Sequence, residues 1–192
     1  MKHSALNKLV LIGASTGGPG QIERIVNELP TLNDTSIIIA QHMINEFIQS
    51  FAKRLKEHTL NNISMAENNT PLKAGEIYLC NGLTTVIKSG FEFSFANEPT
   101  KENRYNPNIN ELFYSLVSVT DKIKILCVLL TGIGEDGVDG CKYLSLNKAR
   151  CITESKESAI VDGMPYCARK KVPNIEIYDI SEIINKIKEF CS

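Results

Sequence analysis

The sequence predicts an α/β fold, with a doubly wound, mostly parallel sheet, helices on both of its faces and one antiparallel hairpin. Short apolar runs alternate along the chain with segments whose apolar residues recur every three or four positions, as in amphipathic helices. The strand-like runs are apolar at consecutive positions, which is typical of strands buried on both faces. With 192 residues and no internal linker or repeat, the chain is expected to form one domain over residues 1–192.

The first half of the chain contains three expected strands. The first, at 9–12, precedes a helix whose apolar residues follow helical spacing from Ile22. The second, at 36–40, precedes a helix that places Ile48 and residues one turn apart on its inner face. The third is expected at 76–80.

A hairpin and a capped helix follow. Strands at 85–88 and 91–96 flank Ser89-Gly90, and phenylalanines alternate with smaller residues in the second strand. Asn108, with Glu111 three positions later, then predicts the start of a helix.

The last third repeats the strand and helix alternation. The most apolar strand is expected at 125–130, shorter strands at 151–153 and 175–178, and a C-terminal helix carries Ile183 on its inner face. The basic residues 169–171 are expected on a solvated helix face.

Composition argues against several functions. A net charge of -1 does not suit a general nucleic-acid binder. The apolar stretch from Leu9 to Ala14 is much shorter than the ~20 residues of a membrane-spanning helix, so no membrane insertion is expected. The six cysteines include no CxxC pair and no histidine at zinc spacing, so we expect reduced thiols, no metal and a cytoplasmic protein.

The first strand ends in Gly13-Ala-Ser15-Thr-Gly17, and a helix follows. This pattern is typical of a nucleophile elbow, in which a tight turn lifts the serine hydroxyl above the sheet. A plain turn or a phosphate cradle would use the same residues. The motif therefore indicates a catalytic serine only if a base and an orienting acid lie nearby.

Two further strand ends supply them, because ligands and catalytic groups collect at the carboxyl ends of parallel strands. His42 follows the second strand and can act as a base, while Asp136 follows the strand at 125–130 and is expected to accept the Nδ1 proton of that histidine. Each residue taken singly has an alternative role: His42 as a side chain that only hydrogen-bonds to the backbone, and Asp136 as a residue that only caps a turn. The order Ser, His, Asp also differs from the order in α/β-hydrolases.

A nucleotide-binding oxidoreductase is an alternative suggested by the glycines near the first strand. Its fingerprint fails, because Glu23 stands where the third glycine belongs and Gln41-His42 ends the second strand in place of a ribose-binding acid.

The chain resembles the catalytic domain of the chemotaxis protein-glutamate methylesterases, the CheB family. The likeness lies in four segments in family order: Ile12-Gly-Ala-Ser-Thr-Gly-Gly18, Gln41-His-Met43 with Phe51-Ala-x-Arg-Leu55, Leu130-Thr-Gly-Ile-Gly-x-Asp-Gly137 and Gly163-Met-Pro165. It implies that Ser15 is the nucleophile, His42 the general base and Asp136 the orienting carboxylate. It also implies an oxyanion site of backbone N–H groups, with Ile133 as a donor and Thr16 lining the site. For Thr16, capping of the following helix is the alternative.

The resemblance implies hydrolysis of γ-glutamyl methyl esters on the cytoplasmic helices of chemoreceptors, possibly with deamidation of receptor glutamines, and no cofactor. The expected partners are methylated chemoreceptor cytoplasmic domains. A catalytically idle adaptor that binds receptors is an alternative, against which the intact Ser15, His42 and Asp136 argue.

The chain departs from the family pattern in two ways. Asn108, Asn110 and Thr153 replace the family's usual residues and are expected to shape the receptor groove. Family members carry a receiver domain ahead of this domain, and only seven residues precede Lys8, so no receiver domain is expected.

Overall fold

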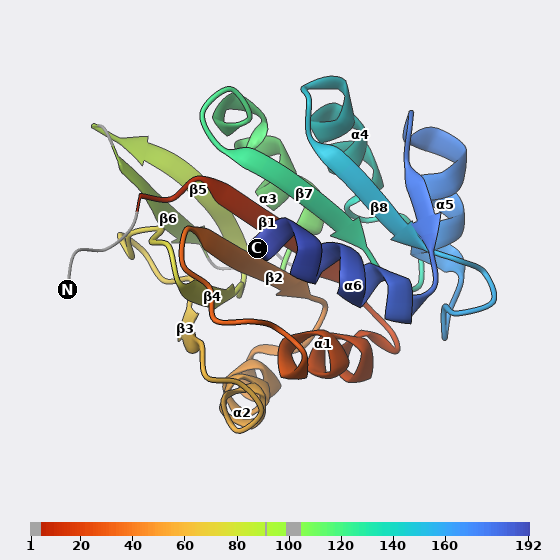
Figure 1. Cartoon of the computed structure of the whole chain (residues 1–192), viewed down its shortest axis with the longest axis horizontal. Helices are drawn as coiled ribbons and strands as arrows, with labels where there is room; N and C mark the ends of the chain where they lie inside the picture. Colours follow the sequence, from red (N-terminus) through yellow and green to blue (C-terminus); the bar gives the residue numbers. More distant parts are fainter. Residues whose placement is uncertain (1–4, 91, 99–104) are drawn as a thin grey trace.

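A seven-stranded parallel sheet forms the centre of the computed structural model, which describes residues 5–90, 92–98 and 105–192. Its strands run in the order β3-β4-β2-β1-β7-β8-β9 (Figure 1). They are β1 (Lys8–Ala14), β2 (Thr35–Gln41), β3 (Asn62–Met65), β4 (Glu76–Leu79), β7 (Lys124–Leu129), β8 (Arg150–Glu154) and β9 (Glu176–Tyr178). The predicted doubly wound α/β class is confirmed.

Helices cover both faces of this sheet (Figure 1). One face carries α1 (Gly18–Asn27), α2 (Asn45–Lys56) and α6 (Ile180–Cys191); the other carries α3 (Ile109–Ser115), the short 3-10 helix η1 (Val117–Val119), α4 (Val138–Leu146) and α5 (Gly163–Lys171). Alternate residues of β1 feed the two cores: Val10 packs on the α1 side and Leu11 on the α3 side. Burial on both faces explains why the central strands are apolar at consecutive positions.

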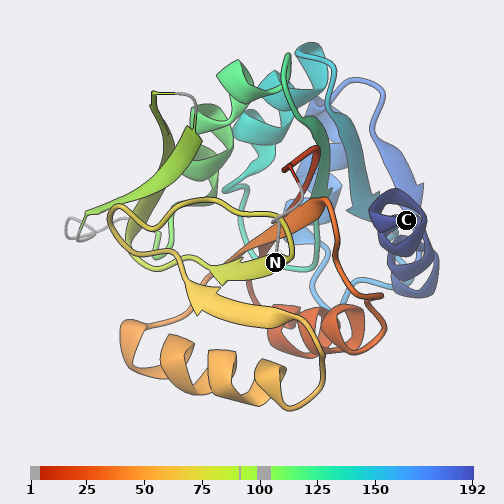
Figure 2. The same ribbon diagram turned by 60° about the vertical axis from the view of Figure 1, so that its left-hand side comes forward.

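The predicted hairpin is present as β5 (Leu83–Ser89) and β6 (Glu92–Glu98), a separate antiparallel pair that packs on the α3 side of the sheet (Figure 2). Ser89 pairs with Glu92, so it belongs to the strand and not to the turn, contrary to the prediction. Phe91, which the sequence placed in the second strand, lies outside the described residues.

The pattern missed two elements. Strand β3 lies at the sheet edge and is only partly buried, so its sequence Asn-Ile-Ser-Met lacks an apolar run. Helix α4 is short, and Gly140 interrupts its inner face where it packs closely on Phe113 of α3.

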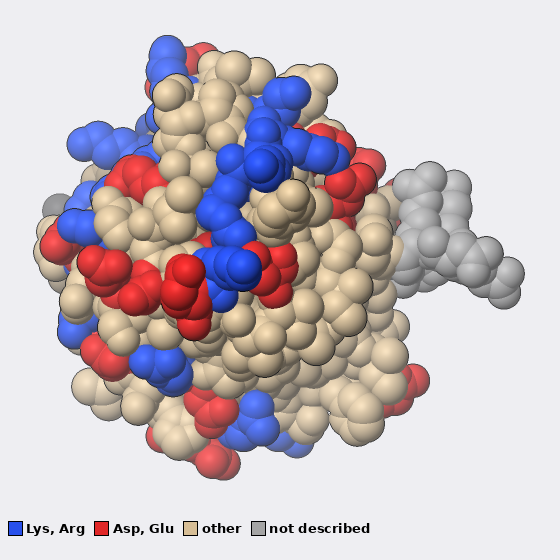
Figure 3. All heavy atoms as spheres, turned by 90° about the vertical axis from the view of Figure 1, so that its right-hand side faces the viewer, with Lys and Arg blue, Asp and Glu red and all other residues tan. Residues whose placement is uncertain are grey.

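The basic segment 169–171 is only partly a solvated face. Arg169 Nη2 lies 2.8 and 2.7 Å from the two carboxylate oxygens of Asp162, and Nη1 donates to the backbone oxygen of Glu154. Basic and acidic side chains lie side by side on the surface that includes α5 (Figure 3). Among the helices of the described segments, none combines the length and apolar character needed to cross a membrane.

Candidate active site

The carboxyl ends of three neighbouring strands bring the predicted catalytic residues together. Ser15 follows β1, His42 follows β2, and Asp136 lies in the loop between β7 and α4. Strand β1 lies between β2 and β7, at the point where the strand order reverses. Such a switch point forms a crevice in open α/β sheets, so the topology places all three side chains at one site.

The turn at Ser15 is tight, because only three residues separate the end of β1 at Ala14 from the start of α1 at Gly18. The Ser15 N–H donates to the backbone oxygen of Thr131 at 3.0 Å, and Gly18 N–H donates to Ser15 O at 2.9 Å. Gly17 has φ +85°, a conformation that favours glycine, and is the N-cap of α1 without a side-chain hydrogen bond. The alternative role of Thr16 as helix cap is therefore wrong, and its side chain is exposed.

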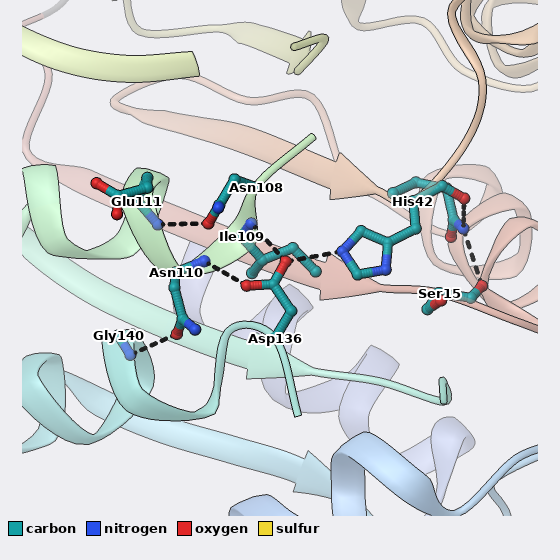
Figure 4. Close-up of polar contacts among 9 residues, drawn as sticks. Ser15, His42, Asn108, Ile109, Asn110, Glu111, Asp136 and Gly140 are labelled. Carbon is teal, nitrogen blue, oxygen red and sulfur yellow. Dashed lines mark hydrogen bonds and ion pairs between the residues drawn. The ribbon is translucent and has the colours of Figure 1, made fainter. Parts of the chain in front are cut away.

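Asp136 holds the imidazole of His42. The His42 Nε2 atom lies 2.8 Å from Asp136 Oδ2, and the Asp136 side chain is only 1% exposed (Figure 4). The prediction that the carboxylate would take the Nδ1 proton is wrong, because Asp136 faces the other ring nitrogen. Figure 4 shows Nδ1 on the side of Ser15, which leaves that nitrogen available for proton transfer.

The first turn of α3 fixes the carboxylate. Asp136 Oδ2 accepts from the N–H of Ile109 at 2.9 Å, and Oδ1 accepts from the N–H of Asn110 at 3.0 Å. These N–H groups form the positive end of the helix, which stabilises a negative charge. Gly137 makes this approach possible, because its φ is +89° and a Cβ there would lie 2.5 Å from Ile109 Cγ2.

Gln41 links His42 to the turn at Ser15. Its Nε2 donates to Ser15 O at 2.8 Å and to His42 O at 2.9 Å, while His42 N–H donates to Ala14 O at 2.9 Å. Figure 4 shows His42 between Ser15 and Asp136. The hydrogen bonds of the described segments include none between the Ser15 hydroxyl and the imidazole. Such contacts commonly tighten only when substrate binds.

Tyr105 covers one face of the His42 imidazole. Its ring is parallel to that of His42 within 3°, with 4.9 Å between ring centroids, and the residue is 48% exposed. Sequence analysis missed Tyr105, because it lies between predicted elements where no periodicity marks a buried or functional position.

The loop after β7 lies directly against Ser15. A Cβ on Gly132 would come within 2.6 Å of Ser15 Cβ, so only glycine permits this approach. The Thr131 hydroxyl donates to Thr16 O at 2.9 Å and accepts from Val161 N–H at 2.7 Å. It thereby ties the elbow to two loops.

Backbone donors near Ser15 are left without an acceptor in the described part of the chain. Among the hydrogen bonds of the described residues, the N–H groups of Thr16 and Ile133 have no acceptor. Thr16 follows the serine, and Ile133 follows the glycine that packs on it. Ile133 as a residue is 64% exposed, so its side chain is not packed into the core.

A buried carboxylate supports this loop from behind. Glu154, at the end of β8, accepts from Thr131 N–H at 3.0 Å, from Gln21 Nε2 at 2.9 Å and from the Ser158 hydroxyl at 2.7 Å. Burial raises the pKa of Glu154, and the hydrogen bonds from Ser158 and Thr131 oppose that rise. The strand-end rule that selected His42 would have found Glu154 had it been applied to β8.

The positions that depart from the family pattern serve the fold. Asn108 caps α3 by accepting from Glu111 N–H at 3.0 Å, as predicted, and Asn110 Oδ1 accepts from Gly140 N–H at 2.8 Å. Thr153 is fully buried and donates to Leu129 O at 2.9 Å, so the expectation that it shapes a receptor groove is wrong.

Comparison with known proteins points to one family. The family model described as CheB methylesterase matches residues 10–187. The chain is 32% identical over 184 residues to a protein-glutamate methylesterase/protein-glutamine glutaminase of Saccharophagus degradans, covering 95% of this chain and 50% of that protein. It is 37% identical over 167 residues to the protein of the same name from Oceanobacillus iheyensis, covering 83% of this chain and 47% of the relative.

A solved structure agrees with these matches. The fold matches the crystal structure of the Thermotoga maritima CheB methylesterase catalytic domain with a TM-score of 0.85 and 26% sequence identity, over 95% of this chain and 98% of that one. The chain spans about half the length of the curated relatives it matches.

Proposed function

The chain belongs to the CheB methylesterase family, and on that premise we propose that it is a serine hydrolase acting on γ-glutamyl methyl esters of chemoreceptor cytoplasmic helices. Relatives that carry the name protein-glutamate methylesterase support the ester as substrate. The observation that carries the proposal is the imidazole of His42, which Asp136 holds at 2.8 Å on one edge while its other nitrogen faces the elbow serine. The protein would work in the cytoplasm, where these receptor helices lie.

Acylation begins with attack of the Ser15 hydroxyl on the ester carbonyl. The Nδ1 atom of His42 takes the hydroxyl proton, and the buried carboxylate of Asp136 stabilises the resulting imidazolium through Nε2. The same proton then passes to the departing methoxide, so methanol leaves. The γ-glutamyl group remains on Ser15 as an acyl-enzyme.

The attacked carbonyl oxygen becomes negatively charged in the tetrahedral intermediate, and hydrogen-bond donors beside Ser15 would stabilise that charge. The N–H groups of Thr16 and Ile133, which have no acceptor among the described residues, would bind the oxyanion, a contribution of roughly 10²- to 10³-fold in rate for each donor. Water then attacks the acyl-enzyme with His42 as base, and the glutamate side chain is released.

Deamidation of receptor glutamines would use the same acyl-enzyme. A glutamine side chain presents an amide carbonyl at the position of the ester, and ammonia leaves in place of methanol with the proton from His42. The second half of the printed name of the relatives, protein-glutamine glutaminase, supports this activity.

The test is methanol release from receptor-containing membranes that a receptor methyltransferase has methylated. We expect release that depends on the chain and on prior methylation of the receptor, with conversion of methyl-glutamate to glutamate in receptor peptides by mass spectrometry. Receptor binding without methanol release would support the idle-adaptor alternative and contradict the proposal.

A further inference from the structure

Three cysteines that are far apart in the sequence meet in the core. Cys127 lies on β7, Cys141 on α4 and Cys151 on β8, and their sulfur atoms all lie within 4.8 Å of one another. The β7–β8 register places Cys127 opposite Cys151, and α4 packs over both strands. Their exposed fractions are 0%, 0% and 3%. Spacing in the sequence does not reveal this cluster, because the fold alone assembles it.

The surroundings of the three thiols are largely apolar, with the Ser145 hydroxyl beside Cys151 as an exception. They belong to the core between the sheet and helices α3 to α5, and no histidine or carboxylate of the described segments joins them as a fourth ligand. The Cys151 thiol donates weakly to the backbone oxygens of Cys141 at 3.6 Å and Ala149 at 3.9 Å. Three thiols within bonding reach of one atom are the ligand set that thiophilic elements prefer.

Charge balance selects the ligand. Three thiolates around zinc or cadmium leave one excess negative charge, and around copper(I) they leave two, which is costly in a core without a compensating cation. Trivalent arsenic bound to three thiolates is neutral. Arsenous acid, the form of arsenite near neutral pH, is also uncharged, so its entry into the core avoids the desolvation cost of a metal ion.

We propose that Cys127, Cys141 and Cys151 form a binding site for trivalent arsenic. Three S–H bonds and three As–OH bonds break, three As–S bonds form, and three water molecules leave. No electron is transferred, so no oxidant or reductant is required. The product links β7, α4 and β8 through one atom, and Cys127 and Cys141 flank the loop that carries Asp136.

The direct measurement is the mass of the folded chain after incubation with sodium arsenite under reducing conditions. We expect one adduct per chain, heavier by one arsenic atom less three hydrogen atoms. Binding to the folded state should raise the thermal unfolding midpoint by about 5–10 °C when arsenite is at about 100 times its Kd.

Single alanine variants test the assignment. Cys127→Ala, Cys141→Ala and Cys151→Ala should each lose the three-hydrogen adduct and the midpoint shift. Cys80→Ala and Cys191→Ala are matched controls, because these buried free thiols lie outside the cluster, and both should keep the adduct. The wild-type adduct mass needs no variant, so the test stands even if a core substitution unfolds the chain.

Three results would overturn the proposal: an adduct that loses only two hydrogens, an adduct that survives in the Cys141→Ala variant, or no adduct at all. Zinc and cadmium give a further comparison. They should bind the wild-type chain at least roughly 10-fold more weakly than arsenite, and equal binding that requires the same three cysteines would contradict the charge argument.

Discussion

The Nε2 atom of His42 lies 2.8 Å from Oδ2 of Asp136, and this contact leaves Nδ1 as the nitrogen that faces Ser15. Asp136 is held from behind by the N–H groups of Ile109 and Asn110. The ring orientation of His42 is therefore linked to the position at which α3 begins.

Asp136→Asn should lower kcat by roughly 10²- to 10⁴-fold, because the amide cannot stabilise the imidazolium and can turn a donor toward Nε2. Methanol release at matched protein concentration measures this loss. Asp139→Asn, which removes an exposed carboxylate three residues away, is the control and should retain wild-type activity. Comparable activity in the two variants would rule out an orienting role for Asp136.

Tyr105→Ala should reduce kcat by roughly 2- to 10-fold, since a stacked aromatic pair contributes about 0.5–1.5 kcal/mol to fixing the ring of His42. Tyr105→Phe keeps the stacking and should restore kcat. Steady-state kinetics separates the roles: a change confined to KM, or a Phe variant as impaired as the Ala variant, would show that Tyr105 acts through substrate or through its hydroxyl.

Thr131→Val should destabilise the fold by about 1–3 kcal/mol and also reduce methanol release, because the lost hydroxyl joins the elbow to the loop at Val161. Thr153→Val is matched to it, since that hydroxyl is equally buried but bonds only within the sheet. Urea unfolding and activity are measured on both. If Thr153→Val lost as much activity as Thr131→Val, the effect would be general destabilisation.

Glu154→Gln tests the buried carboxylate through pH. The pKa of Glu154 in the folded state is raised above its ordinary value of 4.5. The protonated side chain therefore contributes its full stabilisation below pH 4.5, and this stabilisation is lost as the pH rises through the folded-state pKa. The free energy of unfolding of wild type minus that of Glu154→Gln should therefore fall with rising pH across this window and then level off. The exposed Glu157→Gln controls for net charge. A difference that grows with pH would contradict the raised pKa.

Much of the fold was predictable because burial on both faces leaves a plain pattern. Strand β1 and helix α1 could be read directly, since Val10 and Leu11 must both be apolar to pack on opposite helical layers. Edge strand β3 could not be predicted. Its four residues are mostly polar or only partly buried, so their sequence is indistinguishable from that of a loop.

Some features of the site could likewise be predicted from the sequence and others could not. That Ser15, His42 and Asp136 come together was predictable, because each follows the carboxyl end of a buried strand. The choice of Nε2 was not, because it depends on the approach of α3 to the loop after β7. Tyr105 reaches His42 from a segment without periodicity, and the cluster of Cys127, Cys141 and Cys151 exists only once β7, β8 and α4 have packed.

The most direct test of the account is methanol release by Ser15→Ala compared with wild type on the same methylated receptor membranes. The account predicts a loss of roughly 10³-fold or more with an unchanged unfolding midpoint, because the substitution removes the attacking atom and little packing. Activity within about tenfold of wild type would contradict the assignment of Ser15 as the nucleophile and with it the proposed mechanism.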